Sequence, residues 1–186
     1  SPDSIFLYLK NLDVMSFHAI SVHKIVNLDP QLIKNIVLGI DSYNDFLSNA
    51  STLQTIQLLK KSDYIDAFQH IKVDFPFFKN RQYFFRMHTD FPHYLGNNTL
   101  IEWYLINPEI WSNSSMIKKD SKAIYLKDGA GIWFFKKLYD DKIEISYRLI
   151  MDPSGSIPSF MKRIINKKSV VSLFRDVLDE AQKISE

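Results

Sequence analysis

Alternating apolar and polar positions dominate most of this chain. Successive side chains of a strand point to opposite faces, so a period of two indicates a half-buried strand. Between residues 143 and 151 every second residue is apolar, and Glu144, Ser146 and Arg148 lie between these positions. Similar patterns, rich in β-branched and aromatic residues, predict strands at 5–9, 16–26, 53–59, 64–73, 82–90, 99–106, 123–126, 132–138 and 142–151.

Two segments have the periodicity of helices. The first begins at Asp29-Pro30, because aspartate caps helices and proline fits the first turn, and its apolar positions recur every three or four residues up to Ile40. We expect residues 41–49 to be irregular. The second helix is predicted over residues 157–184. At a rise of about 1.5 Å per residue it extends for ~40 Å, enough to cross a whole sheet.

The order of these elements predicts an α+β fold. Short turn-forming segments such as Gly-Asn-Asn at 96–98 join most strands, which favours antiparallel neighbours. Residues 108–120 form a longer polar loop. A sheet that packs against so long a final helix must curve around it. We expect one domain to span residues 1–186.

The most informative segment joins the last strand to the last helix. Asp-Pro-Ser-Gly at 152–155 ends the strand with turn-forming residues, and Ser156 and Pro158 suit the start of a helix. This segment resembles the C-terminal signature of START-type lipid-transfer domains and their bacterial relatives, a strand and turn of the form Y-x-x-x-x-D-P-x-G-x-I-P. The matching positions are Tyr147, Asp152, Pro153, Gly155, Ile157 and Pro158.

Three further segments resemble the same family, in the family's order. Residues 41–46 are similar to the end of its first long helix, D-x-x-x-Y-x-x-W, with compressed spacing and Phe46 in place of Trp. Residues 75–83 are similar to P-x-P-x-x-x-R-D-[YF], without the second proline and without the acid after Arg81. Residues 131–135 resemble its G-x-W-x-[FL] strand. The resemblance implies a helix-grip fold: a curved antiparallel sheet wrapped around a long C-terminal helix, with an internal hydrophobic tunnel.

The apolar faces of four strands and the last helix would line this tunnel. Aromatic residues make up 14% of the chain, which suits a protein that lines a cavity as well as filling a core. A closed, dry core would have the same stripes, and the resemblance favours the tunnel. The candidate ligand-binding residues are Tyr83, Phe85, Met87, Ile101, Trp103, Leu105, Trp133, Phe135, Tyr147, Leu149, Met151, Phe160 and Ile164.

Polar residues on the strands are candidates for orienting a ligand. Arg86, His88, Glu102 and Arg148 alternate with the apolar sets, so we expect each of them on the outer, solvated face. Arg81 matches a motif position of the family, and we expect a structural ion pair there rather than a ligand contact.

The resemblance implies a protein that binds and carries or senses a lipid or other hydrophobic small molecule, without catalysis and in transient contact with a membrane. Each buried methylene contributes about 0.8 kcal/mol, so a chain of about sixteen carbons contributes roughly 12 kcal/mol before ordering costs. Two alternatives stay open. One is a polyketide cyclase-like or hydrolytic enzyme that uses the same cavity, with Tyr147, His88 and Glu102 as acid–base candidates. The other is a protein-interaction module with a vestigial cavity.

Composition excludes several other classes. The chain has 23 basic and 21 acidic residues, a balance that argues against binding to nucleic acid. It has no cysteine, which excludes disulfides and thiolate chemistry. We expect no cofactor and no metal, because His88, Asp90 and His93 are only a weak match to a metal site, and Gly-Ala-Gly at 129–131 predicts a turn before a strand rather than a phosphate loop.

The location of the protein stays open. No apolar stretch approaches the ~20 residues needed to cross a bilayer. The chain begins without Met, as it would after removal of an upstream segment, so a cytoplasmic and an exported protein are both compatible with the sequence.

Overall fold

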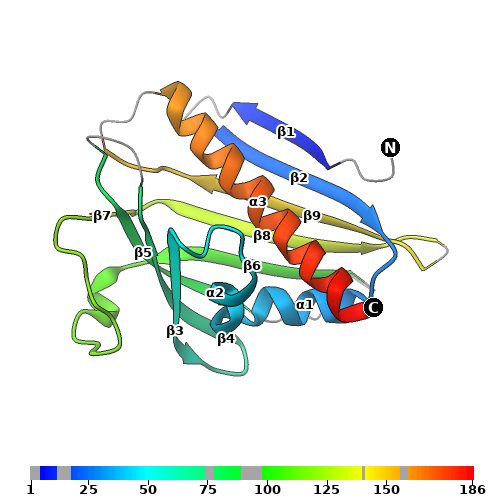
Figure 1. Cartoon of the computed structure of the whole chain (residues 1–186), viewed down its shortest axis with the longest axis horizontal. Helices are drawn as coiled ribbons and strands as arrows, with labels where there is room; N and C mark the ends of the chain where they lie inside the picture. Colours follow the sequence, from blue (N-terminus) through cyan, green and yellow to red (C-terminus); the bar gives the residue numbers. More distant parts are fainter. Residues whose placement is uncertain (1–4, 12–17, 74–77, 89–97, 140, 156–158) are drawn as a thin grey trace.

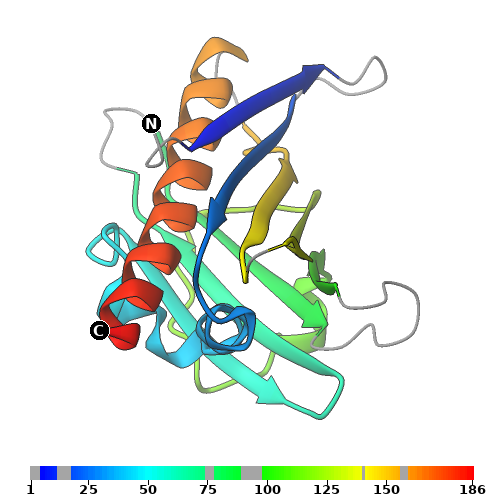
Figure 2. The same cartoon turned by 90° about the vertical axis from the view of Figure 1, so that its right-hand side faces the viewer.

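A curved sheet and one long helix form the frame of the protein. The computed structural model describes residues 5–11, 18–73, 78–88, 98–139, 141–155 and 159–186, with the backbone alone at 11, 18 and 159–166. Helix α3 (Ser159–Ser185) crosses the face of the sheet diagonally in Figure 1, and the perpendicular view in Figure 2 shows the strands bending around it. The predicted α+β fold, with an antiparallel sheet wrapped around a C-terminal helix, is confirmed.

The described residues form a sheet of nine strands. β2 pairs with β9, so the beginning and the end of the chain meet in the sheet. β7 (Ile124–Tyr125) pairs with the start of β5 and is parallel to it, so the antiparallel pattern expected from the short turns fails there. The other strands form antiparallel pairs in the order β1 (Phe6–Asn11), β2 (His18–Val26), β9 (Ile143–Met151), β8 (Gly129–Lys137), β6 (Thr99–Ile106), β5 (Arg81–His88), β4 (Tyr64–Ile71) and β3 (Leu53–Lys60).

Helix α1 (Pro30–Leu38) begins where the sequence predicts. The carboxylate of Asp29 accepts a hydrogen bond from the backbone N–H of Gln31 at 2.9 Å, which satisfies a donor that has no partner within the helix. Ile33, Ile36 and Val37 form its buried face. This face packs in the main core together with α3.

The segment expected to be irregular after α1 is instead helical. It forms the short 3₁₀ helix η1 (Ile40–Ser42) and the single-turn helix α2 (Tyr43–Phe46). The side chain of Asn44 donates to the carbonyl oxygen of Thr55 at 2.8 Å and accepts from the N–H of Thr55 at 3.0 Å. These tertiary hydrogen bonds fix the turn against β3, and the local pattern of residues 41–49 contains no sign of them.

A second, smaller core lies on the outer face of the sheet. Leu58, Phe68, Phe84 and Ile117 are buried there, and the loop that contains the 3₁₀ helix η2 (Pro108–Trp111) covers them. The long loop predicted at 108–120 is therefore a cover for apolar surface. Ile117 and Trp111 of the loop pack in this second core, whereas Ile110 and Met116 are exposed.

The strand β8 begins earlier than predicted. Residues 129–131, expected to form a turn, pair with residues 149–151 of β9 and with 103–104 of β6. Glycine is needed at 131, because a Cβ atom there would lie 2.4 Å from Nε1 of Trp103. These glycines therefore serve the close packing of a strand.

Candidate ligand-binding cavity

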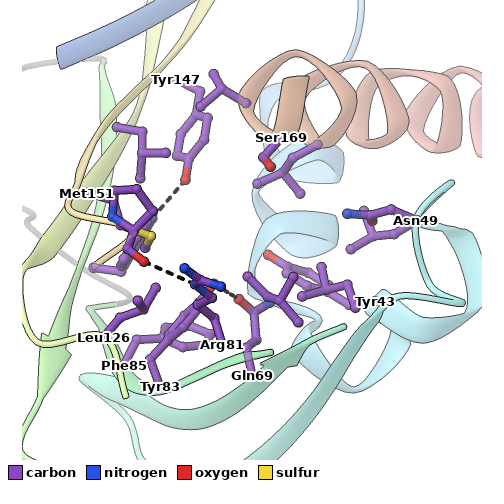
Figure 3. A pocket seen from close by; sticks show the side chains of 18 of the residues that line it. Tyr43, Asn49, Gln69, Arg81, Tyr83, Phe85, Leu126, Tyr147, Met151 and Ser169 are labelled. Atoms are coloured by element: carbon purple, nitrogen blue, oxygen red, sulfur yellow. Dashed lines mark hydrogen bonds between the residues drawn. The ribbon is translucent and has the colours of Figure 1, made fainter. Parts of the chain in front are cut away.

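A cavity lies between the concave face of the sheet, the middle of α3 and the segment around α2 (Figure 3). Its volume is about 150 Å³, counted as the space open to the centre of a water molecule. One water needs roughly 10–15 Å³ on this measure, so the cavity has room for a ligand of on the order of ten non-hydrogen atoms. The lining residues are Tyr43, Leu47, Asn49, Leu53, Gln69, Ile71, Val73, Arg81, Tyr83, Phe85, Met87, Trp103, Leu126, Trp133, Tyr147, Leu149, Met151, Pro153, Ser169, Val170 and Leu173.

The sheet supplies most of the residues that the sequence predicts for a ligand site. Alternation along β5, β6, β8 and β9 points these side chains toward α3. The predicted residues that line the cavity are Tyr83, Phe85, Met87, Trp103, Trp133, Tyr147, Leu149 and Met151. Their contact with a ligand stays a prediction.

Three predicted residues with described side chains do not line the cavity, and two more are not described. Ile101 and Phe135 are buried in the main core, and Leu105 is half-buried and packs against the same core. The side chains of Phe160 and Ile164 lie outside the part of the chain whose side chains the structure describes. Strand parity correctly places Ile101 and Phe135 on the face of the sheet that carries the cavity. It does not predict where along each strand the cavity ends, because that depends on the packing of α3.

Stacked rings close the cavity at that end. The ring of Trp133 stacks on Tyr147 with 4.4 Å between centroids, and its other neighbour is Phe174 of α3 at 5.8 Å. Further along α3, Val177 and Ala181 are fully buried in the main core. The C-terminal half of α3 therefore packs in the main core with α1 and the sheet, and the cavity lies beside residues 169–173.

The segment after α2 supplies a wall that the sequence did not indicate. The backbone N–H and the hydroxyl of Ser48 both donate to a carboxylate oxygen of Asp176 on α3, at 2.9 and 2.8 Å. This contact holds Leu47 and Asn49 across from the sheet. No local pattern marks these residues, although Tyr43 of the same wall lies within a segment that resembles the START family.

The three tyrosines on the wall differ in how their hydroxyl groups are used. Tyr43 donates to the carbonyl of Val37 at 2.6 Å, and Tyr83 donates to the side-chain oxygen of Gln69. Tyr147 accepts a hydrogen bond from the indole N–H of Trp103 at 3.2 Å. Burial raises the pKa of all three phenols above its ordinary value, so they stay protonated near neutral pH.

Among the described residues, Arg81 has no carboxylate partner, so the expected ion pair is not found there. Its side chain is buried at one end of the cavity, where Nε donates to the carbonyl of Pro153 and Nη2 to that of Ser154, both at 3.1 Å. Nη1 donates to the carbonyl of Lys79. The left-handed φ of Ser154, 51°, belongs to the turn that supplies these carbonyls. Carbonyl oxygens therefore take the place of the carboxylate that we expected, and burial lowers the pKa of Arg81.

The other polar candidates lie away from the cavity. Arg86 forms an ion pair with Asp66, His88 stacks on Tyr104 with 5.6 Å between ring centroids, and Arg148 is exposed. Glu102 is half-buried and does not line the cavity. These positions agree with the strand parity of the four predicted residues.

The described lining contains no histidine and no carboxylate. Among the acid–base candidates named from the sequence, only Tyr147 is present there. Within the same described residues, no group of three or more His, Asp or Glu is placed to hold a metal ion, and Asp90 and His93 lie outside them. The described helices also include none with both the length and the apolar character of a membrane span.

Comparison with known proteins shows a likeness of fold without a likeness of sequence. No family model and no curated protein matches the chain. The structure is similar to a STAR-related lipid transfer protein from Xanthomonas axonopodis, with 10% identity, a TM-score of 0.78, and coverage of 97% of this chain and 94% of that one. For human STARD10 the identity is 15%, the TM-score 0.74, and the coverage 98% and 71%.

A biosynthetic protein has a similar fold. The Zhui aromatase/cyclase from a Streptomyces species has 13% identity and a TM-score of 0.58, and the match covers 90% of this chain and 95% of that one. The chain therefore has the helix-grip fold of START domains, which the sequence predicted.

Proposed function

We propose that this protein binds a hydrophobic ligand, a lipid or a molecule with a lipid-like tail, and carries or senses it without catalysis. The observation that carries the proposal is the cavity between β5, β9 and the middle of α3, whose walls are mostly aromatic and aliphatic. An apolar ligand of about ten methylene-sized groups would contribute roughly 8 kcal/mol through burial, before the costs of ordering it. The lipid-transfer name of one structural neighbour, the Xanthomonas axonopodis protein, supports the same function.

An enzyme of the aromatase/cyclase kind is the second candidate, because one structural neighbour bears that name. Such chemistry requires a group in the cavity that can transfer a proton near neutral pH. The described lining offers tyrosines with raised pKa values and an arginine that keeps its proton, and neither is suited to act as a base. The absence of histidine and carboxylate from this lining favours the carrier.

We also propose that the ligand is taken from a membrane surface during transient contact. A hydrophobic molecule has low solubility in water, so direct transfer from a bilayer avoids a solvated intermediate.

Native mass spectrometry of the purified protein, mixed with an extract of total cellular lipids, tests the proposal. We expect one added mass per chain, which denaturation releases because no covalent bond holds the ligand. Failure to add mass from lipid extracts, and also from single-chain fatty acids and alcohols, would contradict the proposed function.

A further inference from the structure

Arg81 brings an unbalanced positive charge to the cavity. A guanidinium has five N–H groups, and three of those on Arg81 donate to carbonyl oxygens of Lys79, Pro153 and Ser154. Two N–H groups, one on each terminal nitrogen, have no acceptor among the described residues. The side chain is only 5% exposed, and Figure 3 draws it on the wall beside Tyr83 and Phe85 of the same strand.

No described carboxylate balances this charge. The ion pairs of the described residues do not include Arg81, and the cavity lining has no Asp or Glu. Carbonyl oxygens carry partial charge only, and a buried cation is normally paired with an anion. An anion entering the cavity would therefore find a partner that is already held in place by its bonds to the turn at 152–155.

Other hydrogen-bond donors on this wall also favour a ligand that accepts hydrogen bonds. Tyr147 accepts from Trp103, and its own hydroxyl hydrogen, which a phenol can also donate, has no acceptor among the described residues. The amide of Gln69 donates to the Thr55 hydroxyl at 3.0 Å and accepts from Tyr83, and its second N–H has no acceptor in the described part of the chain. Neutral Asn49 and Ser169, at the edge between α2 and α3, are able to donate or accept.

We infer that the ligand is an amphiphile with an anionic oxygen headgroup, a carboxylate or a phosphate, which Arg81 binds while the apolar tail occupies the rest of the cavity. The inference rests on the proposed function of the cavity and adds the chemical class of the ligand. The planar guanidinium matches the two oxygens of either anion. An ammonium headgroup would be repelled, and a neutral alcohol would leave the charge unpaired.

Four probes with the same ten-carbon tail test this inference on the unmodified protein: decanoate, decyl phosphate, decanol and decylamine. Their affinities are measured by isothermal titration calorimetry at pH 8 and below the micelle concentration of each probe. We expect at least one anion to bind tenfold or more tightly than decanol, and decylamine to bind most weakly. The order of the two anions distinguishes a fatty acid from a lipid phosphate as the source.

Equal affinities for decanol and both anions would overturn the inference and leave the proposed function standing. If none of the four probes binds, the proposed function itself fails.

Two variants test whether Arg81 is the residue that causes the preference for an anionic headgroup. Arg81→Gln removes the charge and keeps an amide that donates to carbonyls, so decanol should bind as before while the preference for the anion falls to less than threefold. Arg148→Gln removes an exposed arginine from the outer face of β9 and should leave the preference unchanged. An anion preference that survives in folded Arg81→Gln would overturn the assignment to Arg81. If that variant does not fold, the probe series on the unmodified protein decides the matter.

Discussion

Replacement of Arg86 by methionine should lower the free energy of unfolding by about 3 kcal/mol, because it leaves the Asp66 carboxylate buried without a cation. Asp66 is 1% exposed, and it accepts hydrogen bonds from Nε and Nη2 of Arg86 at 2.7 and 2.9 Å. The indole N–H of Trp111 donates to the same carboxylate at 3.2 Å. This cluster fastens η2 to the outer face of the sheet.

Urea unfolding of three proteins tests this expectation. The double variant Arg86→Met/Asp66→Leu should lose less stability than Arg86→Met alone, since it removes the unpaired charge as well as the pair. The single variant should also melt about 6–12 °C lower, at roughly 2–4 °C per kcal/mol for a domain of this size. A loss below about 1 kcal/mol in the single variant would mean that the buried carboxylate is not held as the structure shows. Ligand binding should persist in all three proteins, because the cluster lies outside the cavity.

Substitution of Leu173 by tryptophan should weaken binding of a ten-carbon ligand about a hundredfold. Leu173 lines the cavity from α3, so the larger ring enters a space of about 150 Å³. Displacement of about four methylene groups removes roughly 3 kcal/mol of burial, which corresponds to this loss of affinity. Calorimetric titration with the tightest of the four ten-carbon probes measures the effect.

The same variant should gain stability in the absence of ligand. A ring that fills an empty apolar space makes contacts that the open cavity lacks, so we expect the free energy of unfolding to rise by about 0.5–2 kcal/mol. Ile184→Trp is the matched control, because Ile184 is an apolar residue of α3 that is 54% exposed. It should change neither binding nor stability. If Leu173→Trp is instead destabilised by about 1–3 kcal/mol, the space is already filled and the cavity is not available to a ligand.

Strand parity explains why much of the site was predictable from the sequence. Tyr147, Leu149 and Met151 alternate along β9, and a sheet that curves around one helix turns all three toward it. The turn after β9 has the sequence Asp-Pro-Ser-Gly, and these residue types favour a turn over the continuation of a strand. Both features depend on residues that are close in the sequence, so they can be predicted from local sequence patterns.

Contacts between distant segments account for what could not be predicted. Phe135 has the correct parity, but the stack of Trp133 on Phe174 ends the cavity before it. Arg81 was expected to pair with an acid, and two of the three carbonyls that it meets lie 72 and 73 positions away in the sequence. The volume of the cavity, about 150 Å³, depends on how α2 and α3 close on the sheet, and no local pattern of the sequence records it.

The most direct test of the account is a crystal structure of the protein with a ten-carbon ligand that carries bromine at the end of its tail. Anomalous scattering locates the bromine whichever headgroup is used. We predict one strong peak between β5, β9 and the 169–173 segment of α3. A peak on the outer surface, or a gap between sheet and helix filled by the protein's own rings, would contradict the proposal that the protein holds an apolar ligand there.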